Sequence, residues 1–531
     1  MKKMNLRSVL ITPYSYSYKA NAIKKKLARF KWEDFLTNFY IHLGSFREPK
    51  VGVVSNFPWC CFLALKWKFS NKENTDAIKM SYDEFIEIIN MVYDLQSEAS
   101  NLAYETNVIL GVRRLLVNQL LYQYSDKFNY ASLIRQYIWY CKGNSFYNDE
   151  FERITGVNLD SYYRMASYFV IISSINSKSD SEIFPIKLFI LHWVPIVGTK
   201  QVRNFIRLIS IKPYELFEYI RGYAYDKPVT IEYYQDTPML QKPVFLTDDG
   251  LTVLSKKILK AGLVNLVPEI LKEKSSTYKD KFGKTLERYT ASVLEYYGYD
   301  FITENEIKKI YKTNRMEGKS ADFFITESNS GVLIDCKAIE PAPFVKTTSD
   351  PQRLKERLSS SFIKGIFQCQ ETARNLLACG SINAQVSLSA IIVVHRDHYI
   401  SSGGDVLNLI DPCLEMEIVR LYGGVPIPLS NIYYITIDSF EHLLGMCKMK
   451  GVSLNEFIVM CAEKDKNPST KMASIDLHMA NFMPEGVRDT KEISEVANFL
   501  FENVESVIRS GAAIWNGKAE AYMKIHNYIV S

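Results

Sequence analysis

The spacing of apolar positions separates long helical stretches from one region that is rich in strands. Between about residues 80 and 270, apolar side chains recur every three or four positions, which is the period of an amphipathic helix. One of these helices begins with Ser81, and Glu84 three positions later completes a capping box. The helical period returns from about residue 492 to residue 529. The pattern therefore predicts a large, mainly helical N-terminal part and a helical C-terminal part.

The period changes after Lys274 and predicts an α/β region. A first helix, 278–297, is followed by three strands, a second long helix and a fourth strand. The predicted strands are 301–312, 321–326, 331–339 and 388–394, and the second helix is 352–378. The fourth strand is apolar at all but one position, which is typical of a central strand. These changes divide the chain into the regions 1–275, 276–445 and 446–531.

Length and composition limit the class of protein. At roughly 150 residues per domain, the 531 residues should form three or four units, and the 47% apolar content excludes a disordered chain. No apolar run approaches the roughly 20 residues of a membrane span, and the N-terminal apolar stretch is too short for a signal peptide. The nine cysteines are scattered, without a C-x-x-C pair. We therefore expect a reduced, cytoplasmic protein that does not associate with membranes.

Positive charge is concentrated near the N-terminus. The whole chain has 64 basic and 59 acidic residues, and the net charge of +5 neither demands nor excludes a polyanionic partner. The first 50 residues alone hold 11 Lys or Arg and 3 Asp or Glu, a net charge of +8. Within them, Lys24, Lys25, Lys26 and Arg29 lie among aromatic residues, a combination that can bind a nucleic-acid backbone. The alternative interpretation is a solvated helix face.

The second and third predicted strands carry the candidate chemistry. The turn-forming residues 327–330 join them into an antiparallel hairpin. Because alternate side chains of a strand share a face, Asp335 and Lys337 lie together, and the hairpin can bring Asp322 near Asp335. The other face of the third strand is apolar and consists of Val332, Ile334, Cys336 and Ala338. Two neighbouring carboxylates repel each other unless a cation lies between them, and Mg²⁺ prefers such oxygen ligands. A lysine beside them can hold or deprotonate a water, or offset the charge of a phosphate.

The two predicted helices add further candidates. Glu287 lies one position off the apolar stripe of the first helix and has small neighbours one turn away, so it could complete a metal site. Lys364 and Gln368 are one turn apart on the second helix and could reach the water or the scissile phosphate. The alternative interpretation is a solvated glutamate and a surface glutamine without a role.

These residues and this order of elements resemble the PD-(D/E)xK nuclease superfamily, which has the restriction-endonuclease-like fold. The resemblance covers about residues 276–440 and implies an αβββαβ core with a mixed central sheet. It implies that Asp335 and Lys337 form the (D/E)xK element and that Asp322 stands at the hairpin. Ala321 occupies the place of the proline in the family's name.

The resemblance also implies the remaining site residues and the cofactor. Glu287 would be the carboxylate of the first helix, and Gln368 resembles the helix glutamine of some branches. The metal ligands would be Glu287, Asp322, Asp335 and the backbone carbonyl of Cys336, and the catalytic groups would further include Lys337 and Gln368. The implied cofactor is Mg²⁺, with Mn²⁺ as a substitute, and Lys364 would contact nucleic acid.

The three-residue pattern by itself is not specific, because it also begins at Glu48, Glu306, Glu317 and Asp489. Glu306 lies on a predicted strand and is the real competitor. It lacks an acidic partner across a short hairpin and a helix directly after it, whereas Asp335 has both. The sequence contains no Walker A motif, so we expect no ATP-driven motor within the chain.

The implied activity is endonucleolytic hydrolysis of phosphodiester bonds, with DNA favoured over RNA, in restriction or antiviral defence. Two alternatives stay open. The substrate could be RNA such as tRNA, or the region could be a catalytically inactive module that binds nucleic acid or a protein partner. The presence of Asp322, Asp335 and Lys337 together favours the enzyme. The sequence leaves open whether copies of the chain associate.

Overall fold

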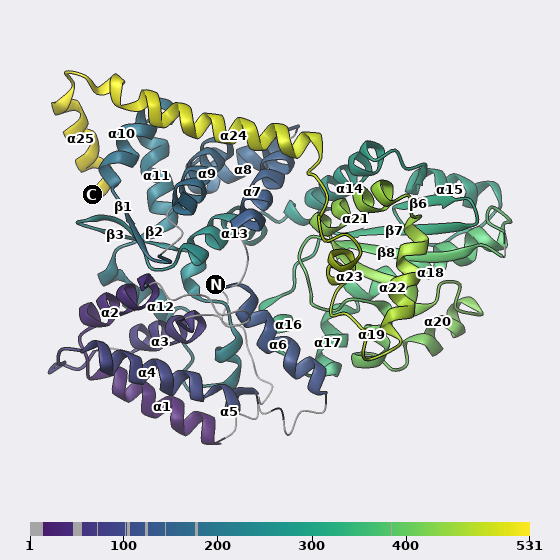
Figure 1. Ribbon diagram of the computed structural model, residues 1–531, viewed down its shortest axis with the longest axis horizontal. Coiled ribbons are helices and arrows are strands. Elements are labelled where there is room, and N and C mark those ends of the chain that lie inside the picture. The colour runs from purple at the N-terminus through teal and green to yellow at the C-terminus, as the bar shows by residue number, and fades with distance from the viewer. Residues whose placement is uncertain are drawn as a thin grey trace. The chain divides into compact units, whose positions relative to one another are not determined.

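The computed structural model describes residues 14–45, 56–71, 73–100, 102, 107–122, 126–143, 145–175, 179–383 and 385–531. The chain forms two compact units, which can be followed in Figure 1. The helical unit comprises residues 1–104, 115–276 and 495–531, and the sheet unit comprises residues 105–114 and 277–494. The division after residue 276 lies next to the boundary expected at residue 275. Residues 446–531 were expected to form a region of their own, but they are divided between the two units.

The helical unit contains most of the helices and a small sheet. Its helices are α1 (Tyr14–Ala28), α2 (Trp32–Gly44), α3 (Pro58–Ser70), α4 (Tyr82–Asp94), α5 (Gln96–Ser100), the end of α6 (Val108–Leu120), α7 (Asp126–Cys141), α8 (Ser145–Thr155), α9 (Leu159–Ile175), α10 (Ile186–Val197), α11 (Thr199–Ile209), α12 (Leu216–Arg221), α13 (Lys256–Lys274), most of α24 (Lys491–Ser510) and α25 (Ala519–Val530). Its strands are β1 (Glu182–Phe184), β2 (Ser210–Ile211), β3 (Val244–Thr247) and β4 (Gly250–Val253), in the order β1-β4-β3-β2. The capping box predicted at Ser81 and Glu84 is present at the start of α4.

The contacts of α24 show why the C-terminal residues join this unit. The Tyr130 hydroxyl donates to the carbonyl of Ala497 at 3.2 Å. The rings of Tyr137 and Phe499 lie 5.8 Å apart. The last predicted helical stretch therefore packs on helices of the N-terminal part.

Helix α3 packs against α1, α2, α4 and α12 in the helical unit. It is apolar on all sides and buried nearly along its whole length, as expected for a helix without a solvent face. Its two lysines are buried with partners. The Lys66 ammonium lies 3.0 Å from the carboxylate of Glu232, whose side chain is 1% exposed. The Lys68 ammonium lies 2.9 Å from the carboxylate of Glu73. A buried charge is tolerated only with such a partner.

The sheet unit is built on a five-stranded mixed sheet in the order β5-β6-β7-β8-β9. The strands are β5 (Phe301–Thr303), β6 (Phe323–Glu327), β7 (Ser330–Lys337), β8 (Ser387–Val394) and β9 (Ile432–Thr436). Strands β5, β6 and β7 pair antiparallel, whereas β7, β8 and β9 pair parallel. The helices are α14 (Tyr278–Tyr296), α15 (Glu304–Thr313), α16 (Pro343–Thr347), α17 (Pro351–Leu358), α18 (Phe362–Ala378), α19 (Gly403–Leu409), α20 (Leu414–Tyr422), α21 (Ile437–Lys450), α22 (Leu454–Asp465) and α23 (Ile475–Phe482).

Helices cover both faces of this sheet (Figure 1). On one face, Leu333 of β7 and Ile392 of β8 belong to the same apolar cluster as Ile366 of α18. On the other face, Ser389 of β8 accepts a hydrogen bond from the amide of Asn455 on α22 at 2.8 Å. Strand β8 is therefore covered on both faces, and its prediction as a central strand is confirmed.

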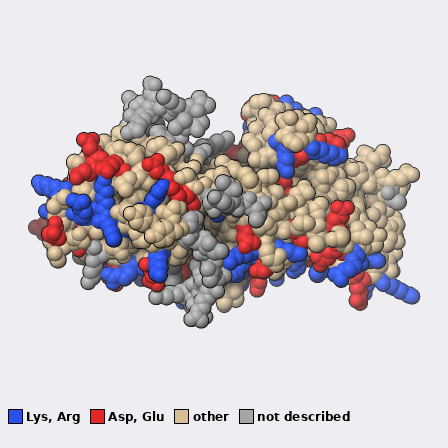
Figure 2. Space-filling view, turned by 90° about the horizontal axis from the view of Figure 1, so that it is seen from below, with Lys and Arg blue, Asp and Glu red and all other residues tan. Residues whose placement is uncertain are grey.

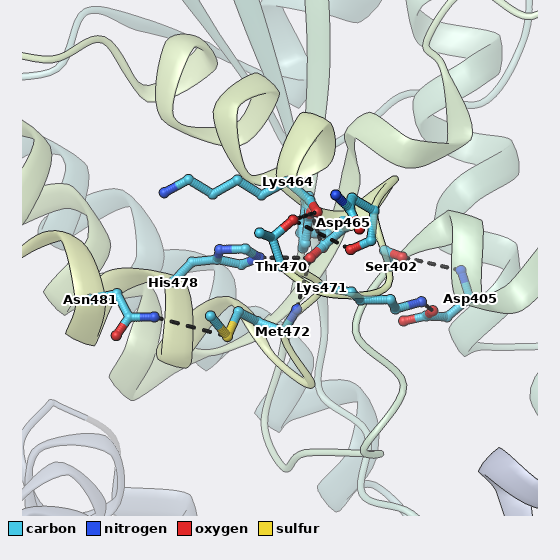
Figure 3. A network of polar contacts seen from close by, with 11 residues as sticks. Ser402, Asp405, Lys464, Asp465, Thr470, Lys471, Met472, His478 and Asn481 are labelled. Atoms are coloured by element: carbon cyan, nitrogen blue, oxygen red, sulfur yellow. Dashed lines mark hydrogen bonds and ion pairs between the residues drawn. The ribbon is translucent and has the colours of Figure 1, made fainter.

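A polar network fixes the segment that follows α22, as Figure 3 shows. The Asp465 carboxylate accepts from the Tyr433 hydroxyl at 2.7 Å, from the His478 ring at 2.9 Å and from the Met472 amide at 3.0 Å. The Lys471 ammonium lies 2.7 Å from the carboxylate of Asp405 on α19. These bonds hold the segment against β9 and α19.

Two predicted elements of the sheet unit are wrong in part. Only residues 301–303 of the predicted strand 301–312 are extended, and α15 follows at once. Thr303 and Glu306 form a capping box there, and Ile307 and Tyr311, four positions apart, are both buried. The predicted helix 352–378 is divided into α17 and α18, because Ser361 is not helical.

Large helical parts beside a smaller mixed sheet agree with the expected fold class at this level. Among the described helices, none combines the length and the apolar character that crossing a bilayer requires.

We expect Glu232→Ala to lower the free energy of unfolding of the helical unit by about 3–5 kcal/mol, because the Lys66 ammonium then stays buried without its carboxylate. The double variant Lys66→Met/Glu232→Leu should recover most of this loss. All six tryptophans lie in the helical unit, so tryptophan fluorescence during urea denaturation reports on that unit alone. A single variant as stable as the unaltered protein would contradict this role of the pair.

Candidate active site

The hairpin of β6 and β7 places two aspartates opposite each other. Phe323 pairs with Ile334, so Asp322, just before β6, lies opposite Asp335. The Asp322 amide donates to the carbonyl of Ile334 at 3.0 Å. The Asp322 carboxylate in turn accepts from the amide of Cys336 at 2.6 Å. Backbone bonds of the hairpin therefore fix the first of the two carboxylates.

Asp335 is fully buried, with 0% of its surface exposed. Its Oδ2 atom forms an ion pair with the ammonium of Lys337 at 2.5 Å, its Oδ1 atom has no partner, and neither oxygen accepts a hydrogen bond of regular geometry. Burial raises the pKa of Asp335 to about 7; the charge of Lys337 opposes this shift and that of Asp322 adds to it. A buried carboxylate oxygen without a partner is costly, so this atom is a ready acceptor for a cation or a proton.

Helix α18 directs Lys337. The ammonium donates to Oε1 of Gln368 at 2.7 Å, and Nε2 of the same amide donates to the carbonyl of Ser320 at 3.4 Å. Burial tends to lower the pKa of Lys337, but the charge of Asp335 and the hydrogen bond to it outweigh burial, and the pKa is raised above its ordinary value. Lys337 is therefore a protonated hydrogen-bond donor at neutral pH.

Glu287 lies on α14 and is half-buried. Burial, together with the charges of Asp322 and Glu304, raises the pKa of Glu287 to about 7. The pKa of Asp322 is also raised, first by burial and in part by Glu304. These three carboxylates therefore influence one another electrostatically. Lys364, also predicted at the site, is exposed on α18, and its charge lowers the pKa of Asp335.

Two further residues at the site, Glu304 and Gly365, were not expected from the sequence. Glu304 begins α15 and accepts from the Ser320 hydroxyl at 3.2 Å. Its helix was predicted as a strand, although the capping box at Thr303 was a readable signal. Gly365 faces Asp335, because a Cβ atom there would lie 3.1 Å from Oδ2 of Asp335 and 3.0 Å from Ile392. A glycine thus lets α18 approach β7 closely, and the pattern of the helix gave no sign of this.

The competitor at Glu306 has a structural role. Its carboxylate accepts from the amide of Thr303 at 2.7 Å and from the hydroxyl of that residue at 2.8 Å, on an exposed helix end. It therefore caps α15.

The basic cluster near the N-terminus belongs to α1 and is only partly free. Lys25 and Arg29 are exposed. The Lys24 ammonium lies 5.6 Å from the centre of the Trp67 ring, and burial lowers its pKa. Lys26 is paired with Glu87. Figure 2 shows basic and acidic side chains mixed at the end of the molecule where α1 lies. Two of the four predicted cations thus face solvent.

The donors at the hairpin are oxygen atoms, which suit a hard divalent cation. Among the residues that the structure describes, no three His, Cys, Asp or Glu side chains form a group that could hold a metal ion. The donors that the hairpin does provide are Asp322, Asp335 with its unpartnered Oδ1, and the backbone of Cys336. Mg²⁺ commonly binds through one or two carboxylates and keeps several waters, so these residues fit it.

The comparisons with known proteins give no relative. No family model matches the chain, no curated protein is similar to it, and no solved structure matches its fold.

Asp335→Asn should change how stability depends on pH in the presence of EDTA. Because the folded-state pKa of about 7 lies above the ordinary 3.8, ionisation of Asp335 destabilises the fold increasingly as pH rises from about 4 to about 7. The variant should therefore be more stable than the unaltered protein at pH 8, by about 2–4 kcal/mol, and this advantage should shrink toward pH 5.

Scanning calorimetry measures this effect, and tryptophan fluorescence identifies which transition belongs to the helical unit. Asp350→Asn, at an exposed N-cap of α17, is the matched control and should not make the protein more stable than the unaltered protein at pH 8. A variant that is less stable at pH 8 than at pH 5, relative to the unaltered protein, would contradict a buried, destabilising carboxylate.

Proposed function

We propose that the protein is a metal-dependent nuclease that hydrolyses phosphodiester bonds at the end of the β6–β7 hairpin. The observation that carries the proposal is the fully buried Asp335, whose Oδ1 has no partner and whose Oδ2 lies beside the ammonium of Lys337. Structural residues rarely leave a buried carboxylate oxygen unpaired, whereas active sites often do. The observed order is α14, β5, α15, β6, β7, α16, α17, α18, β8. It contains the αβββαβ order of the PD-(D/E)xK superfamily with three further helices, and in this way it supports the resemblance.

Asp322, Asp335 and the carbonyl of Cys336 would hold Mg²⁺ or Mn²⁺, and Glu287 would join them from α14 when the cation reduces the repulsion between the carboxylates. The chemistry that the cation supplies when bound is charge neutralisation and a lowered pKa of bound water. The hairpin bond from Cys336 to Asp322 keeps the two aspartates in register before any ligand arrives.

Lys337 would stabilise the negative charge that develops on the phosphate. Its raised pKa keeps it protonated, so it acts as a donor and not as the base that removes a proton from water. The Gln368 side chain accepts a hydrogen bond from the Lys337 ammonium and adds no charge to the site. Lys364, exposed on the same helix, would contact the substrate backbone.

DNA is the proposed substrate and restriction or antiviral defence in the cytoplasm the proposed setting. The substrate and the setting rest on the resemblance alone. The fold does not determine them, because one fold hosts many functions. The experiment offers supercoiled plasmid, linear duplex, single strands and tRNA, each with Mg²⁺, Mn²⁺ or EDTA. Cleavage of tRNA alone would assign the RNA alternative, and metal-dependent cleavage of none of them would overturn the enzyme.

Asp335→Asn should reduce cleavage of the preferred substrate to background, because the variant loses the charge that binds the cation. Glu306→Ala is the control, since Glu306 is exposed and its carboxylate caps α15 through Thr303. It should retain most of the rate in a gel assay. Equal losses in both variants would show that the assay reports on folding and not on the site.

Lys337→Gln should slow cleavage by about 10²–10³-fold, the usual cost of removing a donor to a developing charge. Because the lysine does not ligate the cation, binding of Mn²⁺ measured by titration calorimetry should persist. Loss of Mn²⁺ binding as complete as in Asp335→Asn would contradict the separate roles of the two residues.

A further inference from the structure

The chain that leads into Asp322 is fastened to α18 at consecutive residues. We call residues 314–321 the entry loop. The Lys319 amide donates to Oε1 of Glu371 at 3.1 Å, the Ser320 carbonyl accepts from Gln368 at 3.4 Å, and the Ala321 amide donates to the Thr372 hydroxyl at 2.8 Å. A surface loop usually forms hydrogen bonds to water. Hydrogen bonds from three successive residues to one helix therefore restrain the entry loop.

Thr372 makes the innermost of these attachments. Both Thr372 and Ala321 are fully buried, so water cannot replace the bond between them. The Thr372 hydroxyl also donates to the carbonyl of Gln368 at 2.7 Å. A hydroxyl has a single proton, and here the helix takes it, which leaves the oxygen lone pairs directed at the loop amide. The side chain is thus a fixed acceptor for the residue next to Asp322.

Gly318 and Glu371 hold the outer part of the entry loop. Gly318 has φ +151°, and a Cβ atom there would lie 2.5 Å from Oε1 of Glu371. A residue with a side chain would be strained at this positive φ, and its Cβ atom would displace the Glu371 carboxylate. The Tyr422 hydroxyl, 3.5 Å from Oε2, steadies the other end of the carboxylate.

The same face of α18 also contacts Lys337 and Asp335. Gln368 bonds the ammonium of Lys337, and Gly365 packs against Asp335. We propose that Thr372, assisted by Glu371, is a positioning residue that sets Asp322 relative to Asp335 and Lys337 through the entry loop. The expected effect of Thr372 on metal binding rests on the proposed function, whereas its anchoring of the entry loop does not.

Two measurements test the proposal on the full chain. Thr372→Val removes only the hydroxyl acceptor, Thr372→Ser keeps it, and Ser389→Ala removes another buried hydroxyl that accepts from Asn455 on the far face of the sheet. In metal-free protein, Thr372→Val should raise hydrogen exchange at residues 319–322 by at least about tenfold. It should also weaken Mn²⁺ binding by about tenfold, the effect of one lost hydrogen bond. Thr372→Ser and Ser389→Ala should resemble the unaltered protein in both measurements.

The outcomes separate this inference from the proposed function. A Thr372→Val protein that is less stable but exchanges and binds Mn²⁺ like the unaltered protein would overturn the positioning role. Unaltered protein that binds no Mn²⁺ would overturn the metal site, and the exchange data would still decide whether Thr372 anchors the loop. If Thr372→Val does not fold, Gly318→Ala displaces the loop from its exposed side and should show the same two changes.

Discussion

The pair of Asp335 and Lys337 lies between strand β7 and helix α18, and the carboxylate is wholly removed from water. Removing a carboxylate from water is expensive unless a charge and hydrogen bonds compensate it. Here Lys337 compensates one oxygen only. The sheet unit tolerates this because β7 is held on both sides by neighbouring strands and α18 is held close by Gly365. The buried carboxylate thus lowers the stability of the sheet unit, and the packing around it compensates for this loss.

The site stands where the sheet changes direction of pairing. Strand β7 pairs antiparallel with β6 and parallel with β8. The antiparallel side supplies Asp322 through a short hairpin, and the parallel side places buried Ile392 beside Asp335 in the register. A short hairpin fixes which side chains lie opposite each other, and a parallel pair covered on both faces excludes water. The two aspartates therefore stand beside a strand that is paired along both of its edges.

Buried lysines have acidic partners in both units. In the helical unit, Lys66 and Lys68 are buried with acidic partners on or beside α3, and two lysines of α1 are turned toward Trp67 and Glu87. Cations that look free in the sequence are thus partly used for folding. A count of basic residues in a segment overstates what a polyanion could meet on its surface.

Local pattern by itself determined the strands β6, β7 and β8, the helix α14, and the shared face of Asp335 and Lys337, because period and turn chemistry are properties of neighbouring residues. Apolar spacing did not show the start of α15, because three extended residues and a helix have similar spacing over so short a stretch, although the capping-box residues Thr303 and Glu306 marked it. Only the tertiary structure decided that Asp335 has a free oxygen, that Gln368 bonds Lys337, and that Thr372 anchors the entry loop. These are contacts between residues distant in the chain, and their geometry depends on how α18 packs on the sheet, which no local spacing contains.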